Sequence, residues 1–462
     1  MHIEVVDRSA PVPASVTQRE RLDIGRHVHR INNILQIALA FDGEVESGAL
    51  VDAIVQLGRR HEVLRARFPV REDGRHVISI AADLPLPQVV DLSASATAEV
   101  EGMARLRDFL SAPFDLEQGP LFRAIVIKIH ARRYLVGLPV DHVIGDGISC
   151  ALLRRDLMEF YSARVSHTVP AIPPLPLQFL DYAAWEARQL ESGGFDQSLA
   201  YWKDKLAGVD AIPYSGLVDS AADSARTPDL GILRFKVAGD VRVGLSMGNS
   251  ALRATPYTLV SAAVMFSAAV RRQQGWRDGR NIDVPLMTSV PNRPPGLKDA
   301  FGYFANISVL RTVFSTGASL AEALKEHGKS LLGSLRHQTL SHALITRRHS
   351  PHLYGVRHGP ALDRIPRYVN FDMSGSLVDI APEIDGVTIT ELHMRLSEVP
   401  RGGIYVRAKE HPDRIGIEVR YRTDWYSDEW IARFARGIDF ALEGFVCGPQ
   451  ERVGALVGSL PR

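Results

Sequence analysis

Hydrophobic positions in the first part of the chain follow the spacing of a strand and then that of a helix. The run from Ile34 to Phe41 is almost continuously apolar and ends at Asp42-Gly43, which predicts a buried strand closed by a turn. Leu50, Ile54 and Leu57 recur at the spacing of one face of an amphipathic helix. Strands and helices that alternate in this way indicate an α/β fold.

A hairpin, a polar turn and a second helix are predicted next. Phe122 to Ile129 and Tyr134 to Val140 are strand-like runs on either side of a short polar segment, which favours a hairpin. The second run leads directly into Asp141-His142-Val143-Ile144-Gly145-Asp146-Gly147. Helical spacing then begins, with side chains at Cys150, Leu153, Leu157 and Phe160. The segment from Asp141 to Gly147 therefore lies where a strand gives way to a helix.

The rest of the chain repeats this mixture of elements. Pro256 to Val270 is typical of a buried helix, and Ser319 with Glu322 forms the capping box of a helix that runs through Leu332. Another helix is predicted from Asp428 to Phe445. The strand candidates are Ile282 to Val290, Tyr303 to Arg311 and Ile415 to Tyr421.

A proline-rich stretch divides the chain. Pro170, Pro173, Pro174 and Pro176 stand close together, and proline removes a backbone donor and restricts the residue before it. Neither a helix nor a central strand is expected to run through this stretch. We therefore predict two α/β parts, residues 1–175 and 176–462.

Composition narrows the class of protein. The 462 residues include 54 Lys and Arg against 53 Asp and Glu, and the formal charge of +1 disfavours a basic groove for nucleic acid. With only two cysteines, Cys150 and Cys447, a disulfide scaffold and a cysteine-built zinc site are excluded. Pro256 to Val270 is too short to span a membrane, and the N-terminus lacks the pattern of a secretion signal. These features predict a cytoplasmic protein that binds neither nucleic acid nor membrane.

His142 is the main candidate for chemistry because of its position. It follows an apolar strand on a glycine-containing turn, where α/β proteins commonly place reactive groups. Histidine transfers protons near neutral pH, and Gly145 and Gly147 allow the backbone to approach a ligand closely. Asp146 is suited to hold the loop through a cation rather than to react. This pattern alone is equally compatible with a histidine that has only a structural role.

The segment from Asp141 to Gly147 resembles the HHxxxDG motif of nonribosomal peptide synthetase condensation domains, which belong to the superfamily of chloramphenicol acetyltransferase. Five further segments are similar to family elements, in the expected order and over nearly the whole chain. They are Arg60-His61-Glu62-Val63-Leu64-Arg65 (RHExLR), Gly119-Pro120-Leu121-Phe122-Arg123 (GPLFR), Asp181-Tyr182-Ala183-Ala184-Trp185 (DYAxW), Tyr201-Trp202-Lys203 (YWxxxL), and Asn292-Arg293 with Gly302-Tyr303-Phe304-Ala305-Asn306 (NR…GxFxN).

The resemblance implies a fold and a reaction. The fold would be two chloramphenicol-acetyltransferase-like lobes, residues 1–175 and 176–462, which form a V-shaped pseudo-dimer with a central tunnel. The reaction would transfer an acyl group from the phosphopantetheine thioester of an acyl or peptidyl carrier protein to a small-molecule amine or hydroxyl. No cofactor and no metal ion of its own is implied. Because the last matched helix lies near the end of the sequence, we expect a free-standing enzyme of secondary-metabolite, for example antibiotic, biosynthesis.

The same resemblance assigns residue roles. His142 matches the motif histidine at the reaction centre and is the predicted catalytic residue. Asp146 would pair with Arg293 and brace the loop, and Gly147 would lie at the tunnel wall with its N–H toward the thioester oxygen. Asp141 stands where the family has its first motif histidine, a position that is mainly structural.

Several alternatives stay open at this point. Asp141, Asp146 and Ser149 also satisfy the DxxxxDxxS pattern of heterocyclization domains, although those domains normally lack the histidine found here at His142. Relatives with altered motifs include non-catalytic domains that recruit partner enzymes. A coenzyme A-dependent acyltransferase is a further alternative, and neither the acyl group nor the acceptor can be read from the sequence.

Other candidate residues favour simpler interpretations. Cys150 belongs to the same helical stripe as Leu153, which favours packing over nucleophilic chemistry. His349, His352 and His358 lie among arginines without a nearby carboxylate or cysteine, so we predict no metal site there. The sequence contains no P-loop, dinucleotide-binding fingerprint or GxSxG element.

Overall fold

The computed structural model describes residues 2–25, 33–219, 229–237, 254–272, 280–353, 367–374, 383–384, 386–394, 400, 402–411 and 414–461. The chain folds into two compact units. The first comprises Met1–Phe195, Pro291–Ala305 and Asp379–Leu396, and the second comprises Asp196–Val290, Asn306–Val378 and Ser397–Arg462. The first unit thus extends beyond the sequence-based boundary at residue 175, and it takes in two segments from later in the chain.

Contacts of the proline-rich stretch and of the helix after it explain why the first unit continues. Arg60 donates to the carbonyl of Pro173 at 2.8 Å, which holds the stretch in this unit. Helix α5 (Phe179–Glu191) follows and buries its apolar face. Asp181 of that helix pairs with Arg8 from the start of the chain at 2.6 Å. The prolines therefore form a connection within the first unit.

The first unit contains a six-stranded sheet. In spatial order its strands are β14 (Glu383–Ile384), β15 (Val387–Glu391), β2 (Ile34–Asp42), β7 (Arg133–Asp141), β6 (Ile125–His130) and β5 (Gln88–Asp91). β2 and β7 are antiparallel, with Ile34 opposite Asp141 and Asp42 opposite Arg133. β6 and β7 form the predicted hairpin, and β5 runs parallel to β6. The predicted strand at residues 34–41 is confirmed.

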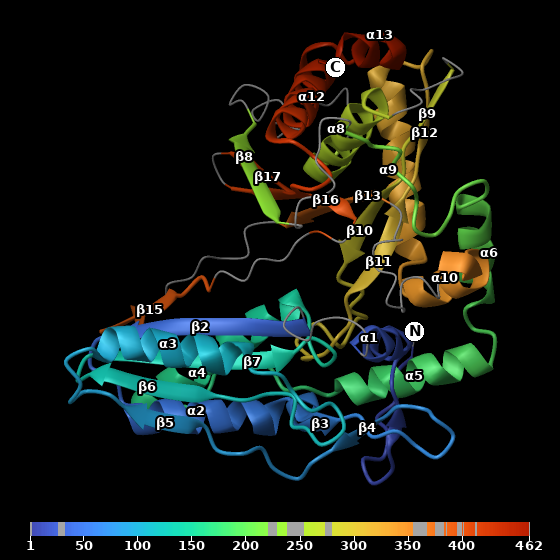
Figure 1. The fold of residues 1–462 in the computed structure, drawn as a ribbon. Helices are drawn as coiled ribbons and strands as arrows, with labels where there is room; N and C mark the ends of the chain where they lie inside the picture. Colours follow the sequence, from blue (N-terminus) through green and yellow to red (C-terminus); the bar gives the residue numbers. More distant parts are fainter. Residues whose placement is uncertain are drawn as a thin grey trace. The chain divides into compact units, whose positions relative to one another are not determined.

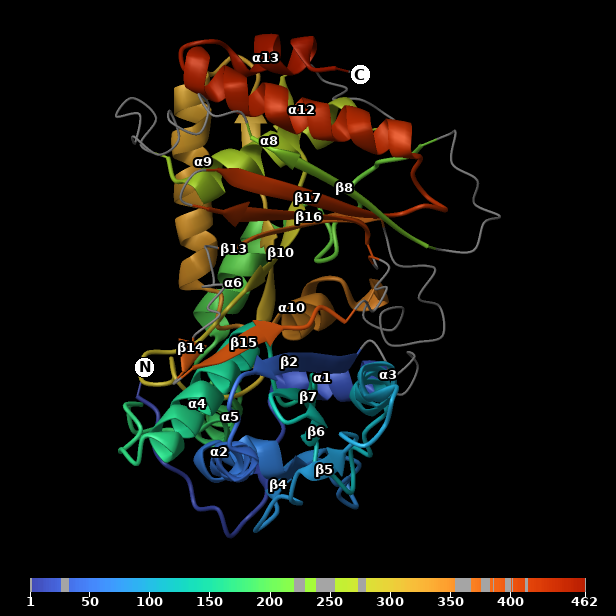
Figure 2. The same ribbon diagram turned by 90° about the vertical axis from the view of Figure 1, so that its left-hand side faces the viewer.

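Helices cover both faces of this sheet (Figure 2). They are α3 (Ala98–Ser111) on one face, and α2 (Ser47–Arg60) and α4 (Gly147–Val165) on the other. Side chains along β2 point alternately to the two faces of the sheet, because successive side chains of a strand point to opposite sides. Ala40 belongs to a buried cluster with Leu106 of α3, whereas the ring centres of Phe41 and Tyr161 of α4 are 5.7 Å apart.

Smaller elements complete the first unit. They are α1 (Val16–Gly25), the short helix η2 (Glu62–Arg65) and a three-stranded sheet of β1 (Val12–Pro13), β4 (Val77–Ile80) and β3 (Ala66–Arg67) in that spatial order. In Figure 1, α1 and α5 lie near the end of β7, where the candidate site begins.

The second unit contains its own six-stranded sheet. Its strands, in spatial order, are β11 (Asn306–Leu310), β10 (Leu286–Val290), β13 (Tyr368–Ser374), β16 (Gly403–Glu410), β17 (Ile415–Arg422) and β8 (Leu230–Lys236). β13 runs parallel to both of its neighbours, and the other pairs are antiparallel. β9 (Asn281–Asp283) and β12 (Val313–Ser315) form a separate pair. The predicted strand at residues 415–421 is confirmed as β17.

The second unit also contains helices (Figure 1). They are α6 (Asp196–Lys205), α8 (Pro256–Val270), α9 (Leu320–Arg336), α10 (His342–His349), α12 (Asp428–Cys447) and α13 (Val453–Ser459). α8 is buried from Thr258 to Ala269 and packs against α12, as expected for an apolar helix without a polar face. Ser319 and Glu322 form the predicted capping box at the start of α9. All three helices predicted here from sequence are confirmed.

Two predicted strands are shorter than expected. Residues 282–290 form two strands of different sheets, β9 and β10, because Pro285 between them has no N–H for a ladder. Of residues 303–311, only Asn306–Leu310 is a strand. The N–H groups of Phe304 and Ala305 donate to the carboxylate of Asp146 instead of to a neighbouring strand.

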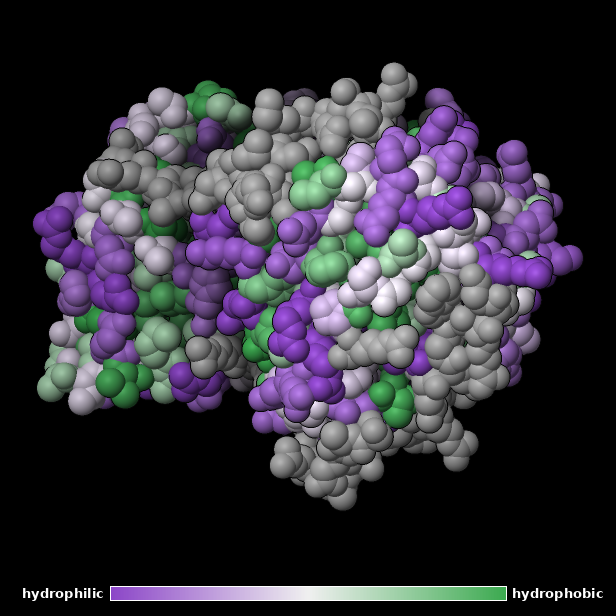
Figure 3. Space-filling view, turned by 90° about the horizontal axis from the view of Figure 1, so that it is seen from above, coloured by the Kyte–Doolittle hydropathy of each residue, from purple (hydrophilic) through white to green (hydrophobic). Residues whose placement is uncertain are grey.

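Hydrophilic and hydrophobic side chains alternate in small groups over the described part of the face shown in Figure 3. None of the helices in the described ranges is long and apolar enough to cross a membrane. Those ranges also hold no cluster of three His, Cys, Asp or Glu side chains arranged to bind a metal. His349 instead lies 2.9 Å from the carbonyl of Val209, and His352 lies 3.3 Å from Asp210, while His358 is outside the described residues.

Candidate functional site

The turn between β7 and α4 is stabilised by its first residue. Asp141 is buried, and its Oδ1 accepts the backbone N–H of Val143 at 2.9 Å. The carbonyl of Asp141 accepts the N–H of Ile144 at 3.1 Å. An aspartate at this position therefore satisfies the backbone of the turn, a common use of this side chain.

His142 is partly buried and contacts two other segments of the first unit. Its backbone N–H donates to the carbonyl of Asn33 at 2.6 Å, just before β2. Its ring meets that of Tyr303 edge to face, with the ring centres 5.2 Å apart and the planes at 76°. Aromatic pairs prefer this geometry, so Tyr303 constrains the orientation of the imidazole.

Two side chains of helix α1 contact the same region. Gln18 is fully buried, and its side-chain amide donates to the carbonyl of Val143 at 3.0 Å. The guanidinium of Arg21 lies 5.4 Å from the ring centre of Tyr303 and donates to Oδ1 of Asn33 at 3.2 Å. Sequence analysis missed these contacts, because Gln18 and Val143 are 125 positions apart and no local pattern links them.

Asp146 holds two parts of the first unit with one carboxylate. As the N-cap of α4 it accepts the backbone N–H of Ser149 at 2.8 Å. Its Oδ2 accepts the N–H groups of Phe304 and Ala305 at 3.1 and 3.0 Å. Its Oδ1 accepts Nη2 of Arg293 at 2.9 Å. Asp146 thus fixes both the start of α4 and the segment 291–305.

The pair of Asp146 and Arg293 is buried together with a serine. The guanidinium of Arg293 lies 4.6 Å from the ring centre of Phe304. Burial lowers the pKa of Arg293, and the charge of Asp146 opposes that change. The hydroxyl oxygen of Ser149 accepts Nη2 of Arg293 at 2.8 Å and the N–H of Gly302 at 3.1 Å. Ser149 therefore extends the ion pair into a connected polar network.

Asn292 explains how the chain enters this segment. Its φ is 41°, in the left-handed region that asparagine tolerates better than most residues. Its side-chain amide lies 3.4 Å from the hydroxyl of Tyr182 on α5. The Asn-Arg sequence thus combines a sharp backbone turn with a cation for Asp146.

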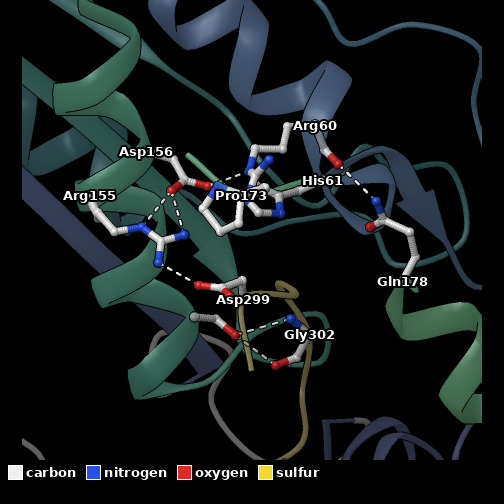
Figure 4. Close-up of polar contacts among 9 residues, drawn as sticks. Arg60, His61, Arg155, Asp156, Pro173, Gln178, Asp299 and Gly302 are labelled. Carbon is white, nitrogen blue, oxygen red and sulfur yellow. Dashed lines mark hydrogen bonds and ion pairs between the residues drawn. The ribbon is translucent and has the colours of Figure 1, made fainter. Parts of the chain in front are cut away.

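The same segment has a second charged anchor, shown in Figure 4. Arg155 of α4 donates to Asp299 at 2.6 Å and to Asp156 at 2.8 Å. Asp156 is fully buried and also accepts Arg60 at 2.7 Å and lies 2.9 Å from Nε2 of His61. Burial lowers the pKa of His61, so a neutral ring donates its Nε2–H to Asp156. The Arg-His pair of the RHExLR segment therefore stabilises the packing of α4.

The two glycines of the motif have different surroundings. A Cβ at Gly145 would lie 2.9 Å from the ring of Phe301, so close packing excludes a side chain there. A Cβ at Gly147 would meet no atom of the described residues within 4 Å. Gly147 is exposed at the first turn of α4, and its predicted contact with a thioester stays a prediction.

Cys150 also lies on α4, near the site. Burial raises the pKa of its thiol to about 12, and the neighbouring charge of Asp146 acts in the same direction. Such a thiol is protonated near neutral pH, so it is a poor nucleophile. Leu153, one turn further along the helix, is fully buried. These features agree with the packing role expected from sequence.

The five residues singled out by the sequence, Asp141, His142, Asp146, Gly147 and Arg293, all belong to the first unit. The structure places Arg293 against Asp146 and places Tyr303, from the same segment as Arg293, against His142. The family model for the condensation domain matches residues 27–458. This chain belongs to the condensation domain family.

One curated relative is the phosphinothricin tripeptide synthetase PhsC of Streptomyces viridochromogenes. It is 30% identical over 347 residues, which are 72% of this chain and 30% of the relative. Condensation domains of this kind thus occur within much longer proteins, and this chain spans less than a third of that relative's length.

Two solved structures have a similar fold. One is the complex of the X-domain and OxyB from teicoplanin biosynthesis, with a TM-score of 0.79, 21% identity and coverage of 100% of this chain and 98% of the other. The second is the starter condensation domain of rhizomide synthetase RzmA, with a TM-score of 0.74, 18% identity and coverage of 96% and 98%. The predicted α/β fold of the chloramphenicol acetyltransferase type is thereby confirmed.

Proposed function

We propose that this chain acts as a condensation enzyme that transfers an acyl group from a carrier-protein phosphopantetheine thioester to an amine or hydroxyl. The product would be an amide or an ester in secondary metabolism. The observation that supports this most directly is His142, at the end of a buried strand on a turn fixed by Asp141, Asp146 and Gln18. A rigid loop holds a proton-transfer group in one place, which acyl transfer requires.

The proposed reaction needs one proton transfer and no covalent enzyme intermediate. The acceptor nitrogen or oxygen attacks the thioester carbonyl, a C–N or C–O bond forms, and the C–S bond breaks. The proton lost by the acceptor passes to the neutral imidazole of His142 and then to the departing sulfur. Because the acceptor attacks directly, no cofactor is needed, and the protonated thiol of Cys150 takes no part.

Asp146 is unsuited to the role of the base in this proposal. Its oxygens already accept hydrogen bonds from Ser149, Arg293, Phe304 and Ala305 inside the protein. With these partners, both oxygens of Asp146 are engaged in hydrogen bonds within the protein. His142 is therefore the residue to which we assign proton transfer, and Asp146 and Arg293 are positioning residues.

The deciding experiment uses the whole chain with an acyl-loaded carrier protein and a pool of amines and alcohols. His142→Ala is expected to lower product formation by about 100-fold or more with an unchanged melting temperature. His130→Ala is the matched control, because His130 is an exposed histidine at the end of β6. Equal product from wild type and His142→Ala would overturn the catalytic role.

A second candidate function is recruitment of a partner enzyme without catalysis. It is favoured by the similarity to an X-domain that was solved in complex with OxyB, and by the aspartate at position 141. Carrier binding by calorimetry without product from any donor and acceptor would support this alternative. Acyl-coenzyme A or a pantetheine thioester in place of the loaded carrier tests the third possibility, since a preference for these small donors would argue against a carrier.

A further inference from the structure

The first unit contains a cavity of about 510 Å³ that lies apart from the motif turn. It is bordered by the end of α2, the segment 82–88 and the segment 113–124. None of the residues from Asp141 to Gly147 lines it. Cavities that hold small molecules commonly measure about 300–1,000 Å³, so this one is large enough for a ligand.

One part of the cavity wall is apolar and aromatic. The rings of Phe109, Phe114 and Phe122 line it, together with Leu84 and Leu86. Leu86 is 77% exposed, although it borders this cavity. An apolar ligand body would cover side chains of this kind and release water from them.

Three arginines give the cavity its charge. Arg59, Arg65 and Arg123 line it, and within the described ranges none of them forms an ion pair with a carboxylate. Arg65 donates to the carbonyls of Gly58 and Ala81, and Arg123 donates to backbone carbonyls of the segment 109–113. Their positive charges are therefore not neutralised by these contacts.

Two carboxylates also border the cavity but do not cancel this charge. Asp115 accepts the backbone N–H groups of Glu117 and Gln118 at 2.9 and 3.0 Å, and Asp83 is exposed. Three cations against two anions leave the lining with one positive charge in excess. A cationic ligand is therefore disfavoured, and an anionic one is favoured.

Arg123 is a partly buried cation in this lining. Its guanidinium lies 4.2 Å from the ring centre of Phe114, and burial lowers its pKa. Its Nε is buried and has no hydrogen-bond partner among the described residues. An anionic ligand in the cavity would favour the charged form of Arg123, which burial disfavours.

We propose that this cavity binds an anionic amphiphile, a small molecule with an aromatic or alkyl body and a carboxylate. The body packs on the phenylalanines and leucines, and the carboxylate lies among the arginines beside Arg123. This inference needs only the folded first unit and does not rest on the proposed acyl transfer.

The test uses the whole chain and two fluorescent probes with nearly the same ring system. One is the anion 1-anilinonaphthalene-8-sulfonate, and the other is the uncharged N-phenyl-1-naphthylamine. Arg123→Gln and Arg65→Gln are each expected to weaken binding of the anion at least tenfold and to leave the neutral probe unaffected. Arg67→Gln is the matched control, because Arg67 is an exposed arginine on β3 that does not line the cavity.

A filling variant shows whether the probe binds in this cavity. Ala82→Trp introduces a large ring at an exposed residue of the lining and is expected to abolish binding of both probes. Decanoate is expected to displace the bound anion at concentrations where 1-decanol does not. Melting curves identify variants that fail to fold. If the arginine variants fail to fold, the result for Ala82→Trp alone tests the proposal. Anion binding that Ala82→Trp leaves unchanged, or that folded Arg123→Gln and Arg65→Gln leave unchanged, would overturn the proposal.

Discussion

Nη2 of Arg293 lies 2.9 Å from Oδ1 of Asp146, although 147 positions separate the two residues in the chain. Both side chains are at most 7% exposed. The contact joins the start of α4 to the segment 291–305. The same segment contains Tyr303, whose ring contacts that of His142. Stability of the first unit and orientation of the candidate catalytic residue are therefore linked through one ion pair.

Breaking this pair is expected to destabilise the protein strongly. Asp146→Asn or Arg293→Gln leaves its partner charge buried without compensation, which typically costs about 3–5 kcal/mol of the free energy of unfolding. Urea denaturation measures this loss. Asp52→Asn is the control, because Asp52 and its partner Arg164 are both 56% exposed and such pairs contribute about 0–1 kcal/mol. The double variant should lose clearly less than the sum of the single losses, and strict additivity would contradict a direct interaction.

The second prediction concerns the ring of Tyr303 and assumes the proposed acyl transfer. Tyr303→Phe keeps the edge-to-face contact with His142, so it should retain wild-type turnover. Tyr303→Ala removes the ring and should lower kcat about tenfold, since an aromatic pair contributes about 0.5–1.5 kcal/mol. It should also shift the pH–rate profile, because the imidazole loses a fixed neighbour. Equal kcat values and pH profiles for the two variants would show that Tyr303 does not position His142.

The third prediction separates the two possible reasons for a glycine at position 147. No described atom lies within 4 Å of a Cβ built at Gly147, so packing does not require glycine. Gly147→Ala and Gly147→Leu should therefore fold with wild-type stability, within about 1 kcal/mol. If substrate approaches this residue, kcat/KM should fall with side-chain size. Gly48→Leu is the control, since Gly48 lies in the first turn of α2 with equally open space. Undiminished kcat/KM in Gly147→Leu would exclude that approach.

The fourth prediction concerns the pH dependence of stability through Glu186. This glutamate of α5 is buried, and its Oε2 accepts the N–H of Val16 at the start of α1 at 2.7 Å. Burial raises the pKa of Glu186 to about 7, from an ordinary value of 4.5. Between pH 4.5 and about pH 7, the folded state thus keeps a proton on Glu186 that the unfolded state has released. This contribution to stability is fully present below pH 4.5 and is lost as the pH rises through 7.

Glu186→Gln carries an uncharged group at all pH values and should remove this loss. Between pH 4.5 and pH 8 the wild type should lose up to about 3 kcal/mol more than the variant, as judged by urea denaturation at each pH. Glu117→Gln is a control because Glu117 is exposed. Parallel curves for wild type and Glu186→Gln would mean that this carboxyl has no raised pKa in the protein.

Local patterns predicted much of the secondary structure because its causes are local. The alternation along β2, the capping box at Ser319 and the apolar face of α2 each depend on residues a few positions apart. The family motif likewise predicted the pair of Asp146 and Arg293, while the catalytic role of His142 stays a prediction. These elements of the fold and this ion pair could therefore be predicted from the sequence.

The extent of the strand after Tyr303 was not predictable in this way. The side chains of Phe304 and Ala305 are apolar, yet their backbone N–H groups donate to the carboxylate of Asp146, more than 150 positions away. Gln18 and Arg21 were missed for the same reason, because their partners, Val143 and Tyr303, are brought near only by the fold. Long-range polar contacts leave no periodic signal.

The composition of the first unit from three separated stretches has a consequence for how the protein is made. During synthesis, Asp146 leaves the ribosome well before Arg293, and β2 precedes its partner β15 by more than 300 residues. Until those later stretches arrive, a buried carboxylate and a sheet edge on β2 lack their partners. Native contacts between distant residues slow folding, and exposed strand edges favour aggregation. Expression of residues 1–195 alone should therefore yield an aggregation-prone fragment, and adding chaperones during synthesis should raise the soluble yield of the whole chain.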